Sequence, residues 1–496
     1  MENFKRRYST SNDKVQTIST AVDECLKSNL RAKAQEIAKY YLKVSKSQLD
    51  LKKLINIHNY YKSIGCFDLA VESASALARF AEGSPQTLAY AGTELGALRI
   101  HNGAFDCFQK LKALAPNNAV AHFLLGTAAN ACNKVELAKL SLLKAIKLSP
   151  NFFPAYLSYS QLSKQSSNNN NIELLLKKVH PTQFESMRFI NFALAKEFDD
   201  LNNVANAMQY LEVANRSVSE RQPYYHEIEL KTFNAIKKHF SSSVIDDLND
   251  LDNCTSDSPI FIVGMPRSGT TLLERMISVS NDTQACGELH DFIGQMVFQN
   301  TDKTNRSNLL SVFDTNKEYD LKLVGINYVQ AVRDRAKGKR SIDKMPFNFR
   351  FLGYIVKAVP NCKIIHIKRQ PQAVLLSNYQ QNYKDSINLW SYDKNSAVKY
   401  YKLYQDYMEY WSGFKFNNML EVDYEDLISN PEFVSKLIYN HCNLEWSTEV
   451  LSPNKQNIHS ATQSAAQVRE PIYSSSVYKW ERYMPFFQEW EGLKNE

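Results

Sequence analysis

The segment from Pro259 to Thr271 constrains the fold more than any other part of the chain. It opens with an uninterrupted apolar, β-branched and aromatic run, 260–263, which is typical of a strand covered on both faces. Gly264 and Gly269 follow and leave the backbone bare where a helix is expected to begin. The free N–H groups at such a helix start attract phosphate or sulfate. The segment therefore predicts a buried strand that leads into an anion-binding loop.

The loop departs from the nucleotide P-loop at two positions. Its spacing matches Gly-x-x-x-x-Gly-Lys-Ser/Thr, but Thr270 stands where the lysine belongs, and Arg267 lies inside the loop. An ordinary ATPase uses that lysine on the β and γ phosphates. We therefore expect this loop to hold a different anion.

The second half of the chain alternates strand-like and helix-like segments, which favours a mostly parallel α/β sheet. Ligands of such sheets bind at the carboxyl ends of the strands. The candidate binding residues are therefore the polar ones at those ends: Arg267, Lys344, Arg369 and Tyr424. The expected strands are 259–264, 341–344, 363–368 and 419–423, and the expected helices include 270–279, 320–337, 371–383 and 395–412.

The first half reads as successive helices with an internal period of 34 residues. Residues at packing positions recur in register: Gly92, Ala104, Phe108 and Pro116 return as Gly126, Ala138, Leu142 and Pro150. This pattern favours an all-α solenoid of tetratricopeptide-like repeats, in which neighbours stack to bury the apolar face of each helix pair. A generic helical bundle is the alternative interpretation.

A polar stretch rich in Ser, Asp and Asn, 241–258, separates the two halves. The predicted division is a repeat domain at 1–245, a linker at 246–258 and an α/β domain at 259–496. The net charge of +7 suits an anionic ligand but is too diffuse to indicate nucleic acid.

We expect a cytoplasmic protein without a membrane-spanning segment. No run of about 18 apolar residues occurs, and the first residues lack the apolar region of a signal peptide. The eight cysteines are scattered singly, which is typical of free thiols in a reducing compartment. No Cys or His pair has zinc spacing, so no metal site is expected.

The loop 264–271 resembles the 5′-phosphosulfate loop of sulfotransferases, most closely the tyrosylprotein sulfotransferases and bacterial sulfotransferases with tetratricopeptide repeats. The resemblance implies an N-terminal tetratricopeptide-like solenoid followed by an α/β P-loop-like sulfotransferase domain. Further matches follow in the family's order: Cys286-Gly-Glu288, Asp343-Lys-Met-Pro-Phe347, Lys368-Arg369 with Ser377, Val422-Asp-Tyr-Glu-Asp-Leu427, and Gln467-Val-Arg-Glu-Pro471 with Lys479-Trp480.

The resemblance implies that the donor is 3′-phosphoadenosine 5′-phosphosulfate and that no metal takes part. In the family, residues at these positions bind the nucleotide and stabilise the transition state, and a glutamate after Cys-Gly acts as the base. The implied donor-binding residues are Arg267, Ser268, Gly269, Thr270, Thr271, Arg369, Ser377, Tyr424 and Lys479. The implied catalytic residues are Glu288 as base, with Arg267, Lys344 and Ser464.

The acceptor stays open at this stage: a peptide tyrosine, a saccharide or a phenol would each supply the hydroxyl. The repeats leave two partners open, a bound protein or a second copy of the chain in a homodimer. Two other functions are the alternatives, a P-loop kinase of a small molecule or saccharide, and a non-catalytic repeat scaffold. The missing P-loop lysine argues against the kinase, and the joint presence of Glu288, Arg267 and Lys344 argues against the scaffold.

Overall fold

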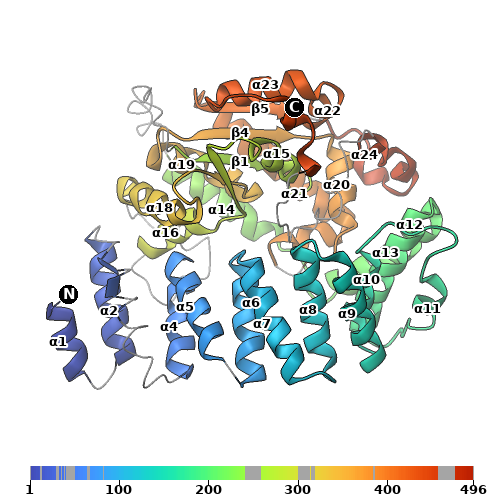
Figure 1. Cartoon of the computed structure of the whole chain (residues 1–496). Coiled ribbons are helices and arrows are strands. Elements are labelled where there is room, and N and C mark those ends of the chain that lie inside the picture. The colour runs from blue at the N-terminus through green and yellow to red at the C-terminus, as the bar shows by residue number, and fades with distance from the viewer. Residues whose placement is uncertain are drawn as a thin grey trace.

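The computed structural model describes residues 2–11, 14–28, 33–34, 36–37, 40, 51–63, 67–81, 83–240, 258–299, 313, 319–383, 386–455 and 475–494. The helices of the first half stand in a row along one side of the α/β region, which the second half forms (Figure 1). The described helices are too short or too polar to cross a membrane.

Three consecutive helix pairs follow the predicted period. They are α4 (Leu51–Ser63) with α5 (Phe67–Phe80), α6 (Pro85–Ala97) with α7 (His101–Leu114), and α8 (Ala119–Ala131) with α9 (Val135–Leu148). Equivalent helices begin 34 residues apart, so the structure confirms the repeat. The glycines of the pattern permit close packing, because a Cβ on Gly92 would lie 2.5 Å from the Phe108 ring.

Further helices extend the row at both ends. Before the three pairs lie α1 (Glu2–Thr10) and α2 (Lys14–Lys27). After them come α10 (Phe153–Ser160), α11 (Ile172–Leu176), α12 (Asn191–Asp200) and α13 (Val204–Ser219). The helix α14 (His226–His239) lies within the α/β region, where its Phe233 packs on Tyr407 of α21 (Lys394–Ser412) (Figure 1).

The sheet has five parallel strands in the order β2-β3-β1-β4-β5. Its central strand is fully buried, as the apolar run predicts. The strands are β1 (Ile260–Gly264), β2 (Thr283–Gly287), β3 (Arg340–Asp343), β4 (Lys363–Lys368) and β5 (Met419–Asp423).

The predicted helices and strands of this half are confirmed, and β2 is the strand that the sequence reasoning missed. The helices near the site are α15 (Thr270–Ile277), α16 (Asp291–Gln299), α18 (Leu321–Arg335), α19 (Leu352–Ala358), α20 (Pro371–Tyr379), α21 (Lys394–Ser412) and α22 (Tyr424–Ser429). The sequence of β2 is short, partly polar and only half-buried, so it lacks the apolar run that marks β1. Its pairing with β3 holds it extended at the edge of the sheet.

Successive side chains of β1 point to opposite faces of the sheet and enter two different hydrophobic cores. Ile260 and Ile262 pack with residues of α15. Phe261 and Val263 pack into a core that continues through α10–α14. The helices α4–α9 have a core of their own. The last helices of the row thus share a core with the sheet, which holds the row in place beside it. Residues 246–257, most of the predicted linker, lie outside the described residues.

Substitution of Gly325 tests the packing of α18 on α19. A Cβ at this position would lie 1.7 Å from the carbonyl oxygen of Ala358, so backbone has to move. We expect Gly325→Ala to lower the free energy of unfolding by about 2 kcal/mol or more, measured by urea titration. Gly96→Ala is the control, because its Cβ would meet only Ala104, at 3.7 Å. Equal transition midpoints for the two variants would contradict this account.

Candidate functional site

The loop after β1 is a tight turn that only glycine permits at two positions. Gly264 has φ +147°, and a Cβ there would lie 2.4 Å from the carbonyl oxygen of Ile367 in β4. Gly269 has φ +106°, and a Cβ there would lie 2.4 Å from the ring of Tyr424. Arg267, between them, is itself left-handed, with φ +70°. The loop therefore lies closely against the ends of β4 and β5.

The start of α15 offers hydrogen-bond donors that the described residues leave unused. The helix begins at Thr270, and its N-cap residue, Gly269, has no side chain to cap the first N–H groups. Ser268 is 1% exposed, and its hydroxyl has no hydrogen-bond partner among the described residues. Buried hydroxyls without partners are rare in native proteins. An anion at the helix N-terminus would accept from this hydroxyl and from the helix N–H groups.

Four predicted donor-binding residues lie together beside this loop. The Nε–H of Arg267 donates to the hydroxyl of Ser377 on α20, at 3.0 Å. The Nη1–H of Arg369 donates to the carbonyl oxygen of Arg267, also at 3.0 Å. The Arg369 guanidinium lies 4.4 Å from the centre of the Tyr424 ring. The chain thus brings two arginines, a serine and a tyrosine from four separate segments to one place.

Glu288 follows β2 at a bulge that redirects the chain. The pairing of β2 with β3 shifts register between Ala285 and Gly287, and Gly287 has φ +75°. Bulges beside active sites commonly re-aim a side chain. Two hydrogen bonds hold the peptide groups of Gly287: its N–H donates to Glu274 Oε1 at 3.1 Å, and its carbonyl accepts from Lys344 N–H at 2.9 Å.

Asp343 holds the chain on the other side of Glu288. Its buried carboxyl accepts hydrogen bonds from the N–H of Leu289, at 3.4 Å, and from the hydroxyl of Tyr328, at 2.9 Å. Burial raises the pKa of Asp343 to about 8, because the charged form is poorly solvated there. Asp343 therefore orients the backbone around Glu288.

The carboxylate of Glu288 is held between two cations. Lys344 Nζ lies 2.5 Å from Oε1, and Arg99 Nη2 lies 2.6 Å from Oε2. Burial opposes ionisation, but the charges of Lys344 and Arg99 and the hydrogen bond from Lys344 outweigh it, and the pKa of Glu288 is lowered to about 2. Glu288 is therefore a carboxylate throughout the physiological pH range.

Arg99 is a functional candidate that the sequence reasoning missed. It belongs to the turn between α6 and α7, 189 positions before Glu288. The only signal in the sequence is an arginine at a repeat turn where the next unit has Asn133. This signal does not identify Glu288 as the partner, because only the folded chain brings the two residues together.

Lys479 lies near the predicted nucleotide site but is bound to the helical row. Its ammonium pairs with the carboxylate of Asp199, at the end of α12, and lies 3.5 Å from Gln380 Oε1, just after α20. Asp199 also accepts from Arg482 and Tyr483. Burial alone would raise the pKa of Asp199, yet these donors lower it. Ser464 lies outside the described residues.

The candidate residues follow the order of the strands. Glu288 follows β2, Lys344 follows β3, the loop 264–271 follows β1, Arg369 follows β4, and Tyr424 follows β5. Neighbouring strands lie about 4.8 Å apart. The site is therefore a row that begins with a carboxylate and a lysine, continues through the anion loop and ends with an arginine over a tyrosine.

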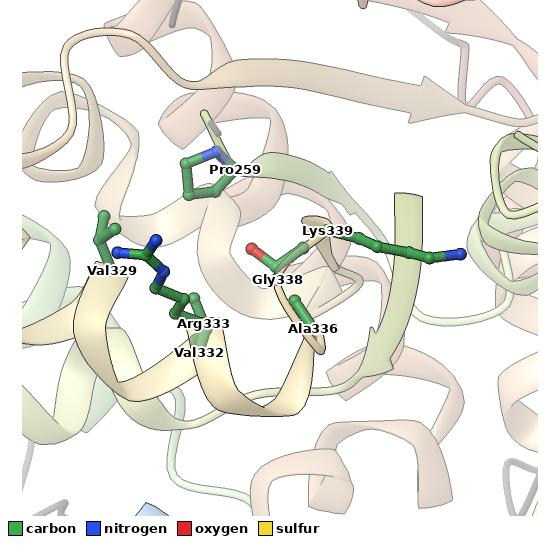
Figure 2. A pocket seen from close by; sticks show the side chains of 8 residues that line it. Pro259, Val329, Val332, Arg333, Ala336, Gly338 and Lys339 are labelled. Carbon is green, nitrogen blue, oxygen red and sulfur yellow. The ribbon is translucent and has the colours of Figure 1, made fainter. Parts of the chain in front are cut away.

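A small pocket at the opposite end of the sheet does not belong to this row (Figure 2). It lies at the amino ends of β1 and β3 and is lined by Pro259, Val329, Val332, Arg333, Ala336, Gly338, Lys339 and Ser341. The basic residues among 333–339 lie at the end of α18 and in the turn before β3. Among the described residues, no three His, Cys, Asp or Glu side chains gather as a metal site.

Comparisons with known proteins relate the α/β region to one family. Residues 259–448 match the model of the Sulfotransferase family. An uncharacterized protein of Aquifex aeolicus is 31% identical over 301 residues, which cover 59% of this chain and 39% of that protein. Protein-tyrosine sulfotransferase 2 of Gallus gallus is 24% identical over 247 residues, which cover 46% of this chain and 64% of that protein. The chain thus spans less than two thirds of the length of either relative.

Among solved structures, the sulfotransferase domain of the Synechococcus PCC 7002 olefin synthase aligns with a TM-score of 0.30 and 17% identity, over 47% of this chain and 96% of that one. The family match covers all five strands and the loop. The α/β region is therefore a sulfotransferase-family domain. It is joined to helix pairs with the tetratricopeptide period, so the predicted class of protein is confirmed.

Substitution of Gly269 tests whether the loop binds an anion. Gly269→Ala would strain a left-handed backbone and press on the Tyr424 ring. We expect the variant to bind adenosine 3′,5′-bisphosphate at least about tenfold more weakly by calorimetry, a loss of about 1.4 kcal/mol. Gly338→Ala is the matched control, because Gly338 also has positive φ but lies in the turn before β3. Equal affinities for the two variants would contradict the assignment of the loop.

Proposed function

We propose that this protein moves the sulfuryl group of 3′-phosphoadenosine 5′-phosphosulfate to an acceptor hydroxyl. The observation that carries the proposal is the Glu288–Lys344 pair at the ends of β2 and β3, beside a loop at the end of β1 that lacks the P-loop lysine. A base, a cation and an anion site in this order match the needs of sulfuryl transfer. The family match at 259–448 supports the same reaction.

The donor would lie along the strand ends. Arg267, Ser268, Gly269, Thr270 and Thr271 would hold the 5′-phosphosulfate, and the unpartnered hydroxyl of Ser268 supports this assignment. The cluster of Arg369 and Ser377 would hold the 3′-phosphate, with Tyr424 beside the nucleotide. Lys479 would close over the nucleotide from its place directly after the short helix α24 (Ser475–Tyr478). Guanidinium forks and helix N–H groups are suited to such anions.

The reaction would be an in-line displacement at sulfur. The acceptor oxygen forms a bond to sulfur, the bond from sulfur to the 5′-phosphate oxygen breaks, and the acceptor proton passes to Glu288. Lys344, Arg267 and Ser464 would stabilise the charge on the transferred group and on the leaving oxygen, as cations and donors do in phosphoryl transfer. A pKa of about 2 makes Glu288 a weak base in its paired state. During the reaction, Lys344 would move from Glu288 to the leaving oxygen. The loss of this positive charge would make Glu288 a stronger base.

A tyrosine hydroxyl is the acceptor that the relatives favour, since several bear the name protein-tyrosine sulfotransferase. A screen with sulfur-35-labelled donor against a tyrosine peptide, a saccharide and a simple phenol would identify the acceptor class. Calorimetry separates this function from the kinase alternative. Tight binding of magnesium ATP without binding of adenosine 3′,5′-bisphosphate would overturn the proposal.

Glu288→Gln tests the base. Loss of general-base catalysis costs about 10²–10⁴-fold in rate, so we expect turnover to fall within that range. Binding of adenosine 3′,5′-bisphosphate should persist, because the ion-pair partners of Glu288 among the described residues, Arg99 and Lys344, lie outside the loop 264–271. The control is Glu432→Gln, which removes an exposed carboxylate paired with Lys436 at 2.6 Å. Wild-type turnover in Glu288→Gln would show that another group is the base.

Arg369→Ala tests the 3′-phosphate site by a comparison of two nucleotides. A charge-assisted hydrogen bond contributes about 1.5–3 kcal/mol, so the affinity for adenosine 3′,5′-bisphosphate should fall about 10–100-fold. Adenosine 5′-monophosphate, which lacks the 3′-phosphate, should bind the variant and the wild type alike. An equal loss for both nucleotides would mean that Arg369 only supports the loop through the carbonyl of Arg267.

A further inference from the structure

Arg99 occupies a backbone position that suits other residues better. It has φ +66°, in the left-handed region, where the turn between α6 and α7 closes. Two backbone hydrogen bonds define the turn: Arg99 N–H to Gly96 carbonyl at 3.1 Å, and Ile100 N–H to Leu95 carbonyl at 2.8 Å. Glycine and asparagine adopt this conformation readily, whereas a long side chain rarely does.

The same turn recurs in the row with asparagine at this place. Asn133, 34 residues later, has φ +61°, and Asn202, between α12 and α13, has φ +60°. Their backbone hydrogen bonds match those of Arg99. The N–H of Asn133 donates to the carbonyl oxygen of Asn130 at 3.1 Å, and the N–H of Asn202 donates to that of Asp199 at 3.0 Å. Of these three turn residues, Arg99 is therefore the one whose residue type does not favour a left-handed backbone. Such departures occur where a side chain is needed for another reason.

The contact that explains Arg99 is with the candidate base. Its guanidinium lies 2.6 Å from Glu288 Oε2, and both side chains are only part-exposed, at 26% and 30%. Its aliphatic stem runs past Gly287, where a Cβ would come within 3.8 Å of Arg99 Cγ. Lys344 engages the other carboxylate oxygen. The two cations together fix the plane of the carboxylate, one from each half of the chain.

We propose that Arg99 is a positioning residue for Glu288, so that the row of repeats completes the active site. The inference rests on the proposed function in one respect, the role of Glu288 as base. Arg99 would orient the carboxylate and hold it ionised. Turnover would then depend on the position of α6 and α7 relative to the sheet.

The charged groups around Glu288 predict the direction of the effect. Lys344, Arg99 and His290 favour its ionised form, and the buried carboxyl of Glu274 on α15 opposes it. Burial raises the pKa of Glu274, with a contribution from the charge of Glu288. Removal of Arg99 deletes one of the favourable charges and leaves the burial in place. The pKa of Glu288 then rises, and the acidic limb of the activity profile moves to higher pH.

Arg99→Asn is the decisive variant, because asparagine is the residue that the equivalent turns use. The turn itself should form at least as well, so a fall in the thermal midpoint would report the lost ion pair with Glu288 and not a strained turn. The acidic limb of the kcat/KM profile should move up by about one pH unit or more, since one opposite charge at this distance shifts a pKa by about 1–3 units. Arg99→Lys should restore part of the shift. An unaltered pH profile in Arg99→Asn would overturn the proposal.

Asn133→Arg is the matched control. It puts an arginine into the equivalent turn one repeat further on and leaves Arg99 and Lys344 paired with Glu288. This variant should lower the thermal midpoint and leave the pH profile unchanged. A pH shift in this variant equal to that of Arg99→Asn would overturn the proposal, because it would attribute the effect to the turn and not to the charge.

A titration that needs neither donor nor acceptor separates this inference from the proposed function. With glutamate labelled by carbon-13 at the side-chain carboxyl, the resonance absent from Glu288→Gln identifies Glu288. It should stay at its ionised position in the wild type down to the pH of acid unfolding, and titrate at higher pH in Arg99→Asn. An unmoved titration overturns the role of Arg99, whatever the activity. A moved titration in a protein that transfers no sulfuryl group supports the role of Arg99 and overturns the proposed function alone.

Discussion

The parallel pairing of five strands is the constraint on which the candidate site depends. Because all five strands run in one direction, their carboxyl ends share one edge, and the residue after each strand joins the same row. Pairing of β1 with β4 places the loop against Ile367, and this contact forces glycine at position 264. Pairing of β2 with β3 brings Glu288 to Lys344. The strand registers thus place the loop and the Glu288–Lys344 pair along one edge of the sheet.

The second constraint is the core that the helical row shares with the sheet. Phe261 and Val263 pack with residues of α10–α14, so the row cannot rotate freely about the linker region. This packing lets side chains of the row meet both ends of the site. Arg99 reaches the carboxylate of Glu288, and Asp199 holds Lys479 and Arg482. The row of repeats is therefore part of the candidate active site as well as a neighbouring scaffold.

Short sequence patterns predicted those parts of the fold that depend on neighbouring residues in the chain. The apolar run 260–263 identified β1, and the glycines at 264 and 269 identified the loop, because both signals are contained in about ten residues. The strand β2 was missed because it is short and half-buried, and only its pairing with β3 holds it extended. Glu288 was found by its motif, but its pairing with Arg99 could not be, since nothing local links a repeat turn to that motif.

The sequence by itself predicted the repeat period, the parallel α/β region, the glycine turn after β1 and the resemblance of this region to sulfotransferases, because each signal lies in residues close together in the chain. The tertiary structure decided which charges meet. It put two cations on Glu288 and lowered its pKa to about 2, and it buried Asp343 and raised the pKa of that group to about 8. Coulomb energy and desolvation depend on distances between segments far apart in the chain, and those distances exist only after folding.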